Sequence, residues 1–179
     1  RSLCGLLLTV WSLGSILIYA REPDGTGAPA ARIGAIELIT GEVLEPAQRR
    51  ELALAGSTAA YLNWMLPQDS RVLLIGDAAP FYYRGDVTYQ TTWDRGPLSV
   101  AMRAAPHEPA AWIDTLASQG FTHLLVDATM LRRWQEAGWN DELITAQRVL
   151  DAAQQHARLE MQFPGQMRQL MLYRLDENR

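Results

Sequence analysis

Lysine is absent from this 179-residue chain, and all 16 of its basic residues are arginine. The chain therefore offers no Schiff-base lysine and no lysine of a phosphate-binding P-loop. Cysteine is almost absent too: Cys4 stands alone, which excludes an internal disulfide and a cysteine-based metal site. The three histidines, His107, His123 and His156, show no metal-ligand spacing. We expect neither a metal nor a cofactor.

Clustered positive charge and known catalytic motifs are also missing. The 20 acidic residues outnumber the 16 basic ones, and the formal net charge is -4. A nucleic-acid surface needs clustered basic residues, so we expect no nucleic-acid partner. The sequence contains no H-E-x-x-H, Walker loop, D-x-D or Ser-His-Asp order. Taken residue by residue, it indicates no reaction.

One long stretch without charge, Ser2–Ala20, begins directly after Arg1 and ends directly before Arg21. As a helix it would be roughly 28 Å long, close to the hydrocarbon thickness of a bilayer. A signal peptide and a buried core helix are the alternatives. Ile18 does not fit the small-x-small cleavage pattern of the first, and the length exceeds the usual range of the second. We expect a membrane helix, and because the chain begins at Arg1 rather than Met, a piece of a longer protein.

The domain organisation follows from this stretch and from the composition after it. We assign residues 1–21 to a transmembrane helix and residues 22–45 to a Pro- and Gly-containing linker with a short helix over 33–43. Residues 46–179 form a soluble domain. One arginine on each side of the apolar stretch leaves the orientation in the membrane undecided.

Hydrophobic periodicity predicts an α/β fold for the soluble domain. Val72–Ile75 and Phe121–Val126 are apolar runs typical of strands covered on both faces, and we expect them to be parallel neighbours joined by a right-handed crossover. A short strand is predicted over 86–90, and the Pro-Gly turn at 164–165 indicates an antiparallel hairpin at one sheet edge, in which Leu159, Met161 and Phe163 alternate. Helices are predicted over 46–66, 97–103, 109–119, 128–137 and 141–157.

The resulting fold class is a small Rossmann-like three-layer sandwich. Its sheet is expected to be mainly parallel with a C-terminal antiparallel hairpin, and one transmembrane helix precedes it.

Asp77 and Asp127 directly follow the two central strands. If these strands are parallel neighbours, both carboxylates lie at the sheet edge where open α/β sheets bind ligands. The alternative, which we favour, is that each aspartate caps the helix after it. A dinucleotide site is not expected, because the run after the first strand is G-D-A-A-P-F and lacks the required glycines.

An aromatic concentration follows the first strand: Phe81, Tyr82, Tyr83, Tyr89 and Trp93. Such rings can stack on sugars, but aromatic residues at this density are more often part of a core, and we favour that interpretation.

Two charged neighbours, Asp94 and Arg95, follow the aromatic stretch. They can hold a polar ligand or pair with each other on a loop, where such a pair contributes little.

The order of these features resembles a known family. An apolar span leads to a polar linker and a helix that ends L-N-W-M-L-P. Five short sequence segments follow in this order: D-S-R-V-L-L-I-G-D, F-Y-Y, T-T-W-D-R, G-F-T-H-L-L-V-D and L-R-R-W. The chain resembles the C-terminal soluble portion of polytopic bacterial membrane glycosyltransferases of the type C superfamily, with Ser2–Ala20 as the last membrane helix.

The resemblance implies a donor, a location and partners. Members take sugars from polyprenyl-phosphate carriers, and their catalytic carboxylate lies in an early extracytoplasmic loop that this chain lacks. No catalytic residue is carried over, and the piece alone is not expected to be catalytic. The domain would lie on the outer side of the bacterial inner membrane. Its partners would be the lipid bilayer, the N-terminal membrane domain of the same protein, and a polyprenyl-linked sugar or glycan acceptor. The candidates for facing a ligand are Asp77, Tyr82, Tyr83, Asp94, Arg95 and Asp127.

Two further hypotheses stay open at the level of sequence. The first is a non-enzymatic, membrane-tethered interaction domain with the same fold. The second is a soluble nucleotide-dependent enzyme whose first helix belongs to the core.

Overall fold

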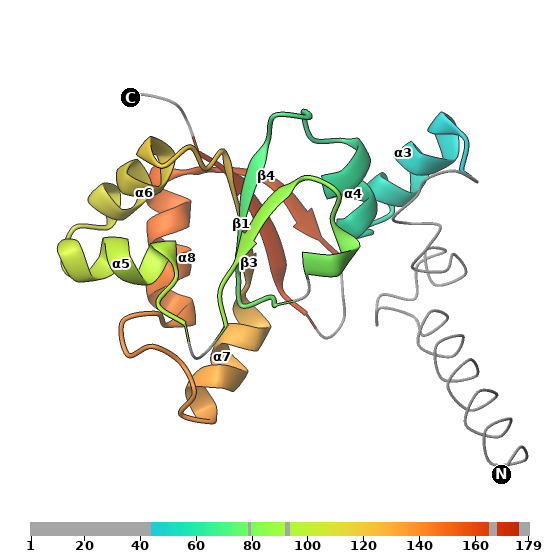
Figure 1. Cartoon of the computed structure of the whole chain (residues 1–179). Coiled ribbons are helices and arrows are strands. Elements are labelled where there is room, and N and C mark those ends of the chain that lie inside the picture. Colours follow the sequence, from blue (N-terminus) through green and yellow to red (C-terminus); the bar gives the residue numbers. More distant parts are fainter. Residues whose placement is uncertain (1–43, 79, 92–93, 165–167, 176–179) are drawn as a thin grey trace, which may run out of the picture.

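The computed structural model describes residues 44–78, 80–91, 94–164 and 168–175. These residues form a mixed α/β fold in which helices cover both faces of one sheet (Figure 1). The membrane helix predicted over Ser2–Ala20, the short helix over 33–43 and the linker up to residue 43 lie outside the described residues. Within the described part of the chain, no helix is long and apolar enough to cross a bilayer.

The sheet has five strands in the order β2-β1-β3-β5-β4. Strand β1 pairs in parallel with both β2 and β3, while β5 is antiparallel to both β3 and β4. The predicted parallel central pair and the C-terminal hairpin at one edge are therefore confirmed. The sheet is mixed rather than mainly parallel, because the last strand inserts beside β3. The strands are β1 Arg71–Ile75, β2 Asp86–Tyr89, β3 His123–Asp127, β4 Arg158–Phe163 and β5 Leu170–Arg174.

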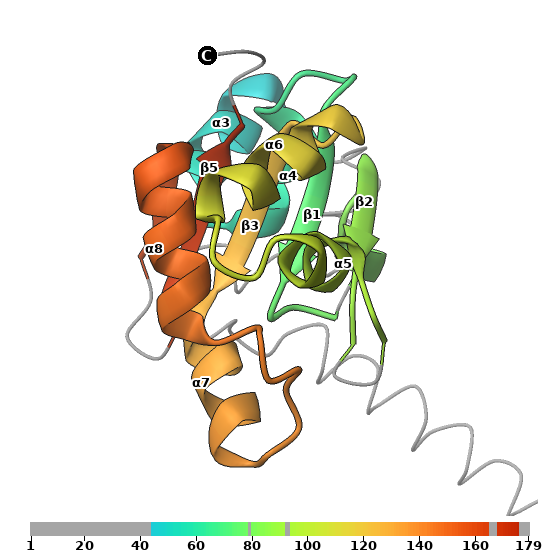
Figure 2. The ribbon, with the colours of Figure 1, turned by 90° about the vertical axis from the view of Figure 1, so that its left-hand side faces the viewer.

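Six α-helices and one short 3-10 helix lie in the described residues. Helices α5, α6 and α8 lie in front of the sheet in Figure 2, and α3 and α4 lie behind it. Their bounds are α3 Pro46–Leu54, α4 Thr58–Trp64, η2 Pro80–Tyr82, α5 Pro97–Ala104, α6 Pro109–Ser118, α7 Ala128–Glu136 and α8 Ala146–His156.

Strand β1 contributes to the core on both of its faces. Successive side chains of a strand point to opposite faces of the sheet. Accordingly, Leu73 and Ile75 pack in the cluster that includes α5, α6 and α8, and Val72 and Leu74 pack in the cluster that includes Leu62 of α4. This two-sided burial explains why the run shows no alternation of apolar and polar residues.

The single helix predicted over 46–66 is wrong, because the structure has two helices there. Gly56 has a φ of +103°, which ends α3, and Ser57 starts α4 by accepting a hydrogen bond from the amide of Ala60 at 3.3 Å. A Cβ on Gly56 would lie 2.5 Å from Cγ of Pro164, so the break also makes room for the turn between β4 and β5.

The helix predicted over 141–157 begins five residues later than expected. Thr145 caps α8 by accepting a hydrogen bond from the amide of Arg148 at 3.3 Å, and residues 141–145 form a loop. The predicted alternation in β4 also fails: Leu159 is 50% exposed, and the register shifts between Leu159 and Met161. A bulge of this kind moves side chains to the other face.

Candidate functional site

The predicted sheet edge brings two carboxylates together. Asp77 follows β1 and Asp127 ends β3, and Arg168, just before β5, reaches both. The Nη2 atom of Arg168 lies 3.9 Å from Oδ2 of Asp77, and its Nε donates to Oδ2 of Asp127 at 2.7 Å. The three residues form the centre of the candidate site, which we call the edge cluster together with Tyr83.

Asp127 is fully buried and is engaged through both of its carboxylate oxygens. Oδ1 accepts a hydrogen bond from the amide of Met130 at 2.8 Å, which caps α7, and Oδ2 receives Arg168. Burial lowers the pKa of Arg168, but the negative charges beside it, chiefly Asp127, raise the pKa by more. The pKa of Arg168 therefore lies above its ordinary value. The predicted helix cap is confirmed for Asp127, and the same carboxylate also forms an ion pair with Arg168.

Asp77 is held by Tyr83, whose hydroxyl donates to Oδ2 at 3.2 Å. Asp77 is itself 8% exposed. Burial, and then the charge of Asp77, raise the pKa of the Tyr83 phenol far above its usual range. Tyr83 therefore stays protonated and acts as a donor rather than as a base. The edge cluster connects the residues just after β1 and η2 with the end of β3 and the residue before β5.

Gly76 lies between β1 and Asp77 with a φ of +81°. A Cβ at this position would lie 2.6 Å from the carbonyl oxygen of Asp127 and 3.1 Å from Cγ of Leu131. Only glycine combines this backbone conformation with so close an approach. Gly76, which is not part of a dinucleotide motif, therefore allows the close contact between the end of β1 and the start of α7.

The remaining predicted ligand-facing residues lie outside the edge cluster. Tyr82 is exposed, and its carbonyl accepts a hydrogen bond from the Asn63 side chain at 2.8 Å. Asp94 and Arg95 are exposed on the loop before α5, where Oδ2 of Asp94 accepts from the Thr91 hydroxyl at 2.6 Å. Whether these residues face a ligand stays a prediction.

Three of the five aromatic residues that follow the first strand have exposed side chains. Phe81 is 81% exposed, Tyr82 45% and Tyr89 44%. The interpretation as core is therefore wrong for these three, and correct in part for Tyr83, which is half-buried. Trp93 lies outside the described residues.

A groove of about 260 Å³ lies between α4 and strands β1 and β2. Neither Asp77 nor Asp127 belongs to its lining, so this groove does not open onto the predicted carboxylates. Tyr83 connects the two features, because it lines the groove and also donates to Asp77. The apolar lining consists of Leu62, Leu66, Pro67, Val72, Tyr83 and Val87, and Asn63, Gln68, Ser70, Arg84 and Gly85 complete it.

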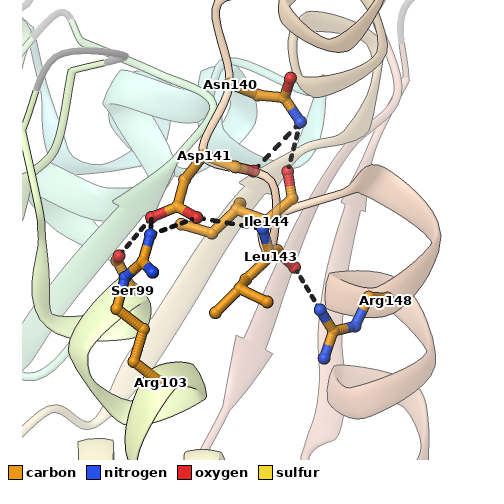
Figure 3. Close-up of polar contacts among 7 residues, drawn as sticks. All are labelled: Ser99, Arg103, Asn140, Asp141, Leu143, Ile144 and Arg148. Atoms are coloured by element: carbon orange, nitrogen blue, oxygen red, sulfur yellow. Dashed lines mark hydrogen bonds and ion pairs between the residues drawn. The ribbon is translucent and has the colours of Figure 1, made fainter. Parts of the chain in front are cut away.

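A second polar cluster fixes the loop between α7 and α8 (Figure 3). Asp141 accepts hydrogen bonds from Ser99 and Arg103 of α5 and from the amide of Leu143 at 3.0 Å. Burial raises the pKa of Asp141, but these donors outweigh it and the net pKa is lowered. Arg148 donates to the carbonyl of Leu143 at 3.0 Å. The cluster is a connection between helices, and its donors and acceptors satisfy one another.

A third cluster lies toward the opposite edge of the sheet, at the start of β3. His123 is 3% exposed, its Nε2 lies 3.2 Å from Oε2 of Glu160, and its Nδ1 lies 2.7 Å from the hydroxyl of Thr122. Tyr61 donates to the other oxygen of Glu160 at 3.2 Å. Burial lowers the pKa of His123, although the charge of Glu160 opposes the shift.

Sequence reasoning missed Arg168, the cation that joins the two aspartates. The only available signal was its position before the last strand, since a strand antiparallel to β3 begins at the edge where β3 ends. Among the described residues, no group of three His, Cys, Asp or Glu side chains is placed to hold a metal ion. The edge cluster brings two carboxylates, one guanidinium and a protonated phenol into contact with one another, an arrangement that stabilises structure.

Comparison with known proteins gives no relative. No protein-family model matches the chain, and neither the curated proteins nor the solved structures contain a match.

Proposed function

We propose that this chain is the C-terminal extracytoplasmic domain, with the last membrane helix, of a bacterial membrane glycosyltransferase that takes a sugar from a polyprenyl-phosphate carrier. The catalytic part would lie in N-terminal membrane helices of the same protein. The proposal rests on the order of a bilayer-length apolar stretch, a linker and an α/β domain. It includes a Rossmann-like description of the domain, supported by the parallel strands β2-β1-β3 between helical layers.

One structural observation supports this division of labour. The buried carboxylate at the sheet edge, Asp127, has both oxygens engaged by α7 and by Arg168. A group so engaged is poorly suited to transfer a proton to a substrate, because a general acid or base must reach the reacting atom. A domain built in this way suits a supporting role beside a catalytic centre elsewhere in the protein.

The coding sequence upstream of Arg1 tests the proposal. We expect several further apolar spans and an acidic residue in an early extracytoplasmic loop. A gene without them would refute the glycosyltransferase assignment. Sugar transfer by the present chain alone would refute the assignment of catalysis to the missing part.

The second candidate function is a membrane-tethered interaction domain without enzymatic activity. The observation in its favour is the exposure of Phe81, Tyr82 and Tyr89, because large exposed apolar side chains often mark contact surfaces. Titration with polyprenyl-phosphate sugars separates the two candidates. Binding supports the glycosyltransferase, whereas no binding together with a specific protein partner supports the interaction domain.

A further inference from the structure

The first turn of α5 is buried and has no cap. Gly96 is the N-cap residue, and no side chain accepts a hydrogen bond from the turn that follows. Pro97 has no amide hydrogen, so the amides of Leu98 and Ser99 are the donors that a capping group would engage. Leu98 is 3% exposed and Ser99 is 0% exposed, and neither amide donates to another described residue. The first turn therefore holds two buried donors for which the described part of the chain supplies no acceptor.

The side chain of Gln90 lies where a capping side chain would begin. Gln90 directly follows β2 and is 5% exposed. A Cβ on Gly96 would collide with Oε1 of Gln90 and would lie 2.8 Å from its Cδ. The φ of Gly96 is -73°, so glycine is needed here for space rather than for its backbone conformation. The amide group of Gln90 nevertheless makes no hydrogen bond with the described residues, and its Oε1 is buried.

The three amides meet at one place and lack an occupant that would satisfy them. Buried polar groups without hydrogen bonds are rare in folded proteins, because each one costs free energy that a partner would recover. A half-turn of the Gln90 amide exchanges its oxygen and its NH2 group, so this side chain can present donors beside the two backbone donors. A group that satisfies all of them must offer several acceptor atoms.

The charge at this end of α5 favours an anion. Arg95 directly precedes the N-cap residue, is exposed, and forms no ion pair with another described residue. The carboxylate of Asp141 accepts from the hydroxyl of Ser99, but it is paired with Arg103 at 2.8 Å (Figure 3). Asp94 balances the formal charge of Arg95. The partial positive charge of the helix N-terminus remains, and it attracts anions.

We propose that Gln90, Arg95 and the backbone amides of Leu98 and Ser99 bind a phosphate group, and we call these four residues the α5 site. Phosphate fits better than a carboxylate, because it has more acceptor oxygens for the backbone, side-chain and guanidinium donors. The inference goes beyond the proposed function and does not depend on it. The phosphate can belong to a lipid-linked sugar or to a soluble phosphate ester, since both carry the same group.

Titration calorimetry of the full chain in detergent, with inorganic phosphate at constant ionic strength, tests the α5 site. We expect saturable binding that Gln90→Leu weakens about tenfold or more, the effect of losing a hydrogen bond to a charged group. The same variant should melt at an equal or higher temperature, because leucine removes a buried amide that has no partner. Arg95→Gln should weaken binding severalfold. Arg84→Gln removes an exposed arginine before β2 and is the matched control, which should bind as the wild type does.

A second variant keeps the test decisive if Gln90→Leu lowers the melting temperature. Gln90→Glu preserves the shape of the side chain, and its negative charge should abolish phosphate binding. No saturable binding to the wild type, or wild-type affinity in either the leucine or the glutamate variant, would overturn the inference. A lower melting temperature of Gln90→Leu with no response to phosphate would show that Gln90 serves α5 as a structural cap, which also overturns it.

Two further probes identify the source of the phosphate. Farnesyl phosphate in micelles represents a lipid carrier, and glucose 1-phosphate represents a soluble ester. Tighter binding of farnesyl phosphate that Gln90→Leu abolishes would support both the α5 site and the proposed polyprenyl-phosphate donor. Equal affinities, or a preference for glucose 1-phosphate, would support the α5 site and count against a lipid carrier as its ligand. Failure of the α5 site is therefore distinguishable from failure of the proposed function.

Discussion

At the scale of single residues, the edge cluster depends on a few atoms that have no substitute. Arg168 is the cation closest to the buried Asp127, and Gly76 leaves the space in which β1 passes the first turn of α7. Burying a carboxylate without a partner is costly, and so is adding a Cβ where the backbone leaves no room.

Replacing Arg168 by Met should destabilise the fold by about 1–3 kcal/mol. The estimate is below the usual cost of breaking a buried pair, because the Arg168 side chain is 44% exposed and water can partly replace it. Thermal unfolding of the full chain measures the effect. Arg132→Met is the control, since Arg132 makes an exposed hydrogen bond to Gln169. Equal melting temperatures for the two variants would show that the ion pair contributes nothing.

Three glycine-to-alanine variants separate backbone strain from steric overlap. Gly85→Ala should change stability by less than about 0.5 kcal/mol, because the new methyl group meets nothing. Gly138→Ala adds only strain at a φ of +70° and should cost about 1–2 kcal/mol. Gly76→Ala adds strain and a 2.6 Å contact with the Asp127 carbonyl, so it should cost more than about 3 kcal/mol. Any other order of melting temperatures would contradict the geometry around Gly76.

At the scale of secondary-structure elements, sequence patterns predicted correctly the strands and helix ends that depend on nearby residues alone. The apolar run of β1 predicted a strand buried on both faces, and Gly120 and Gly138 marked the ends of α6 and α7 with φ values of +86° and +70°. The break at Gly56 was missed because the apolar spacing continues across it. The start of α8 was missed because the loop before it also carries helix-compatible residues.

Features that depend on distant parts of the chain were the hardest to predict. The two aspartates could be placed at one edge, since parallel neighbouring strands imply it. Arg168 could not be placed there, because it lies 41 residues from Asp127 and its position depends on where β5 enters the sheet. The exposure of Phe81 was also missed, because the aromatic spacing contains no sign that Tyr83 turns inward while Phe81 and Tyr82 stay exposed.

The loop between α7 and α8 should depend on the ionised form of Asp141. Its folded-state pKa lies below its ordinary value, so its stabilising effect is fully present above the unfolded pKa and is lost as pH falls through the folded one. Asp141→Asn should cost about 1–2 kcal/mol at pH 7 and progressively less below about pH 4. Melting temperatures from pH 3 to 7 measure this, with Glu142→Gln as the exposed control. A penalty that does not depend on pH would contradict it.

The stability of the fold should fall as pH falls through the range of histidine, because His123 is buried at the start of β3. His123 has a folded pKa below its ordinary value, so the folded state favours the neutral ring. The associated stability is present above the unfolded pKa of about 6.5 and is lost as pH falls toward the folded pKa. The charges that act on the ring are Glu160 of β4 and Arg174 of β5, and Glu160 opposes the effect.

The His123→Gln variant tests this dependence. The melting temperature of the wild type should fall between pH 7 and pH 5, and the variant should lose most of that slope. His107→Gln, in an exposed loop, should keep it. A wild-type melting temperature that rises over this range would mean that Glu160 dominates and that the pKa of His123 is raised instead.

At the scale of the whole molecule, we propose a supporting domain held at a membrane. The described residues form an α/β domain whose edge carboxylates are engaged internally and whose Phe81, Tyr82 and Tyr89 side chains are exposed. The sequence adds a bilayer-length apolar stretch before it. The proposed division between anchor, support and distant catalytic part depends on that stretch more than on any other feature.

Alkaline extraction of membranes from cells that produce the full chain tests this dependence most directly. We predict that the chain stays in the membrane pellet, and that Val10→Arg together with Ile16→Arg moves it to the supernatant, since a charge at the centre of a span costs about 2.5–3.5 kcal/mol. Val100→Arg, at an exposed position of α5, is the control and should not change the distribution. Recovery of the unmodified chain in the supernatant would contradict the account.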